Sequence, residues 1–215
     1  MPAISSPLAQ TFTVEADPES EITGRFLTSV DVYFAAKDDI LPITLEIVNV
    51  INGYPGNKTL PFSRVVKDTA DVNVSDTAAT ATTFTFESPI YIVPNVEYCM
   101  VLMTDSQDYN VWISRMGETD VTAGRFINDQ PFLGVLFKSQ NNSTWSAYDF
   151  EDLKFTLRRA EFTTGGTVYL VNDTLPSRTL ATNPITTTDG SDTLTINHRN
   201  HGMHSTSDNV TIAGL

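Results

Sequence analysis

The segment NNSTW carries the side chains of this sequence that are best suited to contacting a ligand. Residues 134–155 read as strand, polar loop and strand, and Trp145 follows a run of amide and hydroxyl side chains. An exposed indole can stack on the apolar face of a sugar, while amides and hydroxyls bond the sugar's hydroxyl groups. An ordinary turn whose tryptophan packs on its own domain has the same sequence features. The candidate residues for contact with a glycan or a protein partner are Asn141, Asn142, Thr144 and Trp145.

Three histidines lie close together in the segment NHRNHGMHS, and imidazole binds transition metals well. Their spacing puts successive side chains on opposite faces of a strand, and Asn200 and Gly202 disfavour a helix. We therefore predict a turn between two strands and no metal site within one chain. A metal site on a threefold axis would take one histidine from each of three chains. The weak candidates for that metal ligand are His198, His201 and His204.

Acidic residues cluster at 17–21, 38–39 and 149–152, and carboxylate oxygens are calcium ligands. No cluster has the Asp-x-Asp-x-Asp-Gly spacing of a dedicated calcium loop, so we interpret all of them as solvated loop charge. The sequence contains neither a Gly-x-Ser-x-Gly motif nor a Gly-rich phosphate loop, and no carboxylate pair stands out for glycoside hydrolysis. We predict no catalytic residue, no cofactor and no enzymatic activity.

The chain has 215 residues, a net charge of −13 and a pI of about 4.4. Binding to phosphates needs clustered Lys and Arg, so we expect neither a nucleic-acid partner nor an anionic membrane surface. No stretch approaches the ~20 apolar residues of a membrane helix, which predicts no membrane insertion. The amino terminus has no signal-peptide pattern. The single cysteine, Cys99, lies in the apolar run YCMVLM and is expected to be a buried thiol.

Apolar and polar residues alternate with a period of two through most of residues 1–162, and Pro, Gly and Asn separate the runs. Many short strands at near-regular spacing predict an all-β fold, an antiparallel β-sandwich of jelly-roll-like arrangement. The core residues expected from the alternation are Phe12, Phe26, Val30, Val32, Phe34, Leu45, Ile47, Phe84, Phe86, Tyr91, Val101, Trp112, Leu136, Phe155 and Leu157.

The composition changes after the sandwich, so we place a domain boundary between residues 1–162 and 163–215. The second part is rich in Thr, Ser and Asn and has too few apolar residues to close a core. We expect a linker and the start of a short, β-rich, fibre-like segment. It is either continued by a longer modular polypeptide or completed by neighbouring subunits, and a homo-trimer fits this second case.

Several motifs, in this order, resemble a module of virion structural proteins in large contractile-tailed bacteriophages, the myophages that include marine and cyanobacterial ones. The resemblance runs over about residues 7–162 and is carried most specifically by PLAQTF, NGYPG and LFKSQNNSTW. The later segment HRNHGMHSTSDNVTIAGL is similar to the strand-turn-strand repeats of phage fibre proteins.

This resemblance implies a non-enzymatic structural component of a phage virion, in the tail fibre, baseplate or neck and collar. Such a protein is assembled in the host cytoplasm, resides in the virion and has other virion proteins as partners. The alternative is a carbohydrate-binding module that recognises a host surface glycan, and both descriptions apply to a receptor-binding fibre.

Overall fold

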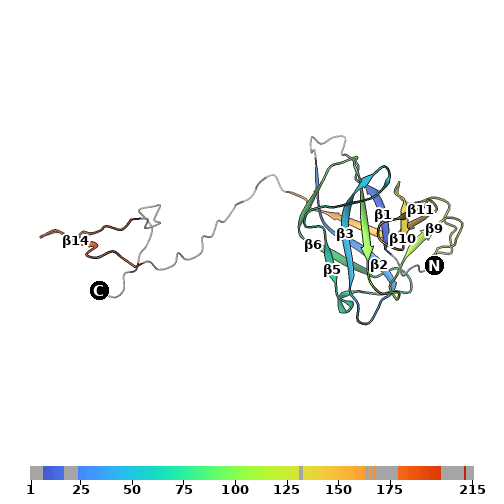
Figure 1. Ribbon diagram of the computed structural model, residues 1–215, viewed down its shortest axis with the longest axis horizontal. Coiled ribbons are helices and arrows are strands. Elements are labelled where there is room, and N and C mark those ends of the chain that lie inside the picture. The colour runs from blue at the N-terminus through green and yellow to red at the C-terminus, as the bar shows by residue number, and fades with distance from the viewer. Residues whose placement is uncertain are drawn as a thin grey trace. The chain divides into compact units, whose positions relative to one another are not determined.

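Strands dominate the computed structural model, which describes residues 7–16, 24–130, 133–162, 165, 167, 179–199 and 211. Among these residues the helical structure is limited to one 3-10 turn, η1, at Thr69–Asp71. The chain divides into two compact units, Met1–Phe162 and Thr163–Leu215 (Figure 1). The all-β, antiparallel fold predicted from the period-two alternation is confirmed.

The first sheet of the first unit contains seven strands, and its pairings are antiparallel. The order across the sheet is β11-β10-β1-β7-β3-β4, with β5 paired to β3. The strands are β1 (Leu8–Thr13), β3 (Ile43–Ile51), β4 (Tyr54–Thr59), β5 (Val65–Lys67), β7 (Glu97–Met103), β10 (Leu136–Ser139) and β11 (Trp145–Tyr148).

The second sheet has the order β13-β2-β6, with β8 paired to β2, and a two-stranded sheet of β9 and β12 accompanies it. Successive long strands alternate between the sheets, since β1, β3 and β7 belong to the first and β2 and β6 to the second. This alternation is the jelly-roll-like feature of the sandwich. The strands are β2 (Arg25–Ala36), β6 (Ala81–Ile92), β8 (Asn110–Val111), β9 (Ile113–Arg115), β12 (Glu151–Leu153) and β13 (Phe155–Arg159).

One hydrophobic core joins the two sheets, because each sheet contributes its alternate apolar residues to the same cluster. Trp112 and Leu157 are half-buried, and Leu157 packs against this cluster. Val101 is buried, but in a second cluster formed with other residues. The predicted core residues that the structure buries in the main cluster are Phe12, Val30, Val32, Phe34, Leu45, Ile47, Phe84, Phe86, Leu136 and Phe155.

The prediction that Phe26 and Tyr91 belong to the core is wrong, since their side chains are 36% and 47% exposed. The register of β2 against β6 shifts between Leu27 and Ser29. Such a bulge reverses which alternate residues face inward, so Leu27 is buried before it and Val30 after it. Phe26 and Tyr91 instead pack edge to face on the outside, with ring centroids 5.3 Å apart.

Within the second unit, β14 (Ile185–Thr187) and β15 (Leu194–Ile196) form an antiparallel hairpin. Gly190 lies between the strands with φ of +77°, a conformation that glycine adopts without strain. None of the residues that the structure describes in this unit is buried. The hairpin therefore lacks a hydrophobic core in the part of the unit that is described.

Candidate functional site

The outer face of the seven-stranded sheet, which points away from the core, carries a second buried apolar cluster. It consists of Ala9, Val48, Cys99, Val101 and Phe137. An antiparallel sheet usually turns polar residues to the outside, so an apolar patch there must be covered. Val50, Met103, Val135 and Trp145 are partly buried against it. Burial raises the pKa of the Cys99 thiol far above its ordinary value, so Cys99 is a packing residue.

The turn after β3, together with β4, forms one cover of this face. Asn52 and Gly53 have φ of 53° and 79°, the positive values that a tight hairpin turn requires. A β-carbon on Gly56 would lie 2.7 Å from the backbone oxygen of Asn49, so glycine is needed at that position. The Tyr54 ring then reaches Phe137, with centroids 5.5 Å apart. The hairpin is thereby fixed over the sheet.

The NNSTW segment forms the opposite cover, in the connection between β10 and β11. The Asn141 side-chain oxygen accepts hydrogen bonds from the backbone N–H groups of Ser143 (3.0 Å) and Thr144 (2.8 Å). Asn142 has φ of 53°, which asparagine tolerates better than most residues. Trp145 pairs with Ser139 at the start of β11. Hydrogen bonds within the loop thus set the positions of Asn142 and Trp145.

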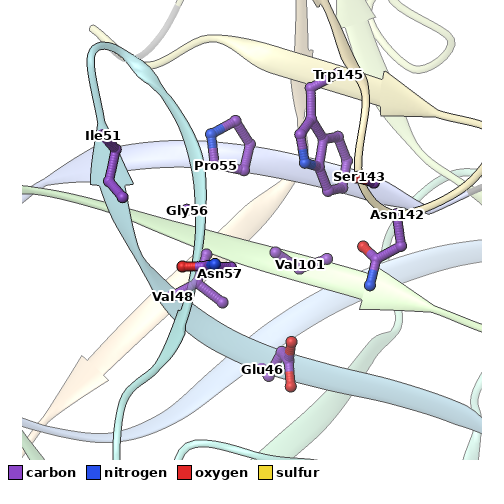
Figure 2. Close-up of a pocket in the computed structure, with 10 residues that line it drawn as sticks. All are labelled: Glu46, Val48, Ile51, Pro55, Gly56, Asn57, Val101, Asn142, Ser143 and Trp145. Carbon is purple, nitrogen blue, oxygen red and sulfur yellow. The ribbon is translucent and has the colours of Figure 1, made fainter.

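A hollow of about 420 Å³ lies between the two covers (Figure 2). Figure 2 shows the Trp145 indole between Pro55 on one side and Ser143 on the other, above Val101. Val48, Val101 and Glu46 form its floor, while Asn57 and Asn142 add amide groups. The hollow therefore combines an aromatic ring and apolar floor residues with a carboxylate and two amide groups.

A second hollow of about 330 Å³ adjoins the first, because Asn142 lines both. Its lining includes Thr44 and Met103, which are cross-strand partners, and the next outward-facing pair, Glu46 and Val101, lines the first hollow. The Asn142 side-chain nitrogen lies 3.0 Å from the sulfur of Met103. We call the two hollows together the outer-face trough.

Two of the four residues proposed from the loop sequence, Asn142 and Trp145, line the trough. The Asn141 side chain organises the loop instead, and Thr144 is exposed without lining either hollow. Sequence reasoning missed Glu46 and Asn57. The sequence signal for Glu46 was its place between two apolar residues, Leu45 and Ile47. Neighbouring residues of a strand point to opposite faces, so the burial of these two in the core puts Glu46 on the outer face.

The weak metal candidates fall largely outside the described residues. His198 is half-buried next to β15, while His201 and His204 lie outside the residues that the structure describes. Where the structure is described, no group of three or more His, Cys, Asp or Glu side chains is placed to hold a metal ion. The histidine proposal therefore stays a prediction.

The acidic clusters have different surroundings. Residues 17–21 lie outside the described part of the chain. Asp38 accepts hydrogen bonds from the backbone N–H groups of Ile40 and Leu41 and from the Ser106 hydroxyl. The Ser106 bond is the leading cause that lowers the pKa of Asp38. Asp38 thus organises its own loop.

Glu151 and Asp152 contribute to a polar network where β12 meets β10 and β1. Glu151 is paired with Arg115, at 2.7 Å, and with Lys138. Asp152 accepts a bond of 3.0 Å from the Gln10 amide, and its second oxygen has no partner among the described residues. Burial raises the pKa of Asp152. These carboxylates join the small sheet to the first sheet.

Comparison of the chain with family models, curated proteins and solved structures finds no match. No helix among the described residues is long and apolar enough to span a membrane.

Proposed function

We propose that this chain is a non-enzymatic structural component of the virion of a contractile-tailed phage, in the tail fibre, baseplate or neck. The observation that carries the proposal is that two boundaries in the chain fall at the same place. The stretch that resembles the myophage module ends near Phe162, and the first compact unit also ends there. The resemblance over residues 7–162 thus covers nearly all of one compact unit, which supports a self-contained module that docks to other virion proteins.

The placement of the reactive side chains in the sandwich supports a structural role. Arg158 donates two hydrogen bonds to one oxygen of Asp31, at 3.0 and 2.7 Å, and this pair joins β13 to β2. Glu151 is held by Arg115 and Lys138. These charged groups stabilise strand contacts, and a docking module needs such a rigid scaffold.

Purified virions offer the direct biochemical test. Particles of a phage that encodes this chain, purified on a density gradient, should contain its peptides in mass spectrometry at a fixed ratio to the tail proteins. Separated tails should retain the chain, because a structural component stays bound when the capsid is removed. Recovery of the chain from the lysate but not from particles would contradict the proposal.

A trimeric assembly completes the proposal for the second unit. The hairpin of β14 and β15 has strands of three residues each, and Leu194 is half exposed. An isolated two-stranded hairpin is marginally stable in water, and further strands added at its open edges would stabilise it. Three neighbouring chains around a fibre axis would supply that pairing.

Light scattering should distinguish the two units. We expect the 215-residue chain to be a trimer, and residues 1–162 to be a monomer because they contain the closed core between the sheets. The shortened chain is the matched control for association through the sandwich. A monomeric full chain, or a trimer of residues 1–162 alone, would contradict this assignment.

A further inference from the structure

The outer-face trough follows two central strands of the sheet. Its floor contains the cross-strand pairs Thr44–Met103 and Glu46–Val101, which are successive outward-facing rungs of β3 and β7. At about 3.3 Å per residue, Thr44 to Val48 spans roughly 13 Å of β3. A site of this form suits an extended ligand of more than one unit.

The floor strands have no free edge within the trough. β7 lies between β1 and β3, and β3 lies between β7 and the strands β4 and β5. An extended peptide usually binds by adding a strand to an unpaired sheet edge, where backbone groups are available. The trough offers side chains instead of backbone groups, which favours a ligand recognised by its own hydroxyl groups.

The polar side chains of the trough suit a neutral sugar. The Glu46 carboxylate and the Asn57 amide both line the first hollow, and neither makes a side-chain hydrogen bond within the described residues. A carboxylate accepts hydrogen bonds and an amide both donates and accepts them, so both can bond hydroxyl groups. Glu46 and the net charge of −13 disfavour an anionic ligand.

The Trp145 ring supplies the apolar contact that a pyranose needs. Trp145 packs against the buried outer-face cluster, which restrains the ring, and it also lines the hollow. Volumes of about 420 and 330 Å³ fall at the lower end of the range for small-molecule sites, about 300–1,000 Å³. Each hollow therefore has the size of a site for a small ligand unit.

We propose that the outer-face trough binds a linear, neutral oligosaccharide. One pyranose stacks on Trp145 and bonds Glu46 and Asn57, and the chain continues past Asn142 towards Thr44. This goes beyond the structural role proposed above and does not depend on where the protein sits in a virion.

A glycan array carrying neutral and acidic oligosaccharides, probed with the full chain, tests the ligand class. We expect selected neutral glycans to bind and acidic ones to be rejected. In calorimetric titration, the affinity for the best neutral glycan should increase from the monosaccharide to the trisaccharide, as the second hollow becomes occupied. Absence of binding to every neutral glycan, or equal binding of acidic ones, would overturn the proposal.

Substitutions locate the site. Glu46→Gln should weaken binding of the best neutral glycan by about fivefold to tenfold, because it replaces a hydrogen bond to a charged group with a neutral one. Asn57→Ala should weaken it by about two- to tenfold. Glu87→Gln is the matched control, because Glu87 is exposed on β6 in the other sheet and should leave binding unchanged.

Trp145→Ala should reduce binding by about tenfold or more, but it also removes packing on the outer-face cluster. The exposed Asn57 therefore provides the independent variant, and thermal melting of each protein shows whether the fold is intact. Unchanged affinity in both Glu46→Gln and Asn57→Ala would show that any glycan binds elsewhere and would overturn the assignment.

Discussion

Replacing Phe34 by alanine should lower the free energy of unfolding by about 3–5 kcal/mol. Phe34 is 0% exposed, and its ring lies 6.4 Å from Phe84 and 6.0 Å from Tyr109, measured between centroids. The substitution removes the contacts with Phe84 on β6 and with Tyr109 beside β8, and it leaves a cavity that a close-packed core fills only in part. Urea denaturation followed by circular dichroism measures the change.

Phe150→Ala is the matched control for this prediction. The Phe150 side chain is 67% exposed, so its removal should change the free energy of unfolding by no more than about 0.5 kcal/mol. Equal midpoints for Phe34→Ala and the unchanged protein would mean that β2 presents its opposite face to the core.

Replacing Glu151 by glutamine should cost about 1.5–3 kcal/mol of stability at neutral pH, the usual range for hydrogen bonds to charged groups. The Glu151 side chain is nearly buried between Arg115 and Lys138. Burial opposes its ionisation, but the bonds and charges from Lys138 and Arg115 outweigh burial and lower its pKa. Thermal melting at neutral pH measures the loss.

The pH dependence gives a second readout. Because the folded pKa of Glu151 lies below its ordinary value of 4.5, its contribution is present above that value and is lost as the pH falls through the folded pKa. Glu151→Gln should remove this acid-dependent loss. Asp152→Asn is the contrasting variant, because burial raises the pKa of Asp152 and protonation of that carboxyl favours the fold. Identical acid profiles for the Glu151 variant and the unchanged protein would contradict the role of the network.

The alternation of residue types was enough to predict the sandwich and most of its core. It failed at Phe26, because the bulge after Leu27 reverses the inward face and leaves no mark in the sequence pattern. Val101 was placed in the main core for a related reason. Both faces of β7 are apolar, so alternation cannot tell which one faces the other sheet.

The candidate site was only partly predictable, since its residues come from distant parts of the chain. Trp145 was found because an aromatic residue after a polar loop is conspicuous. Glu46 lies in β3, which pairs with β7, and Asn57 lies in β4, which pairs with β3. The order of strands in the sheet brings both residues near the loop between β10 and β11. The pairing of strands that are distant in the sequence depends on the whole fold, so local sequence patterns do not reveal it.

A density map of an intact particle, from a phage that encodes this chain, would show where the protein sits. We expect the sandwich formed by residues 7–162 to fit density in the tail fibre, baseplate or neck and to contact another virion protein there. We also expect threefold symmetry where the second unit begins. A map of the complete particle in which the sandwich fits no part of the tail or neck would contradict a structural role in the virion.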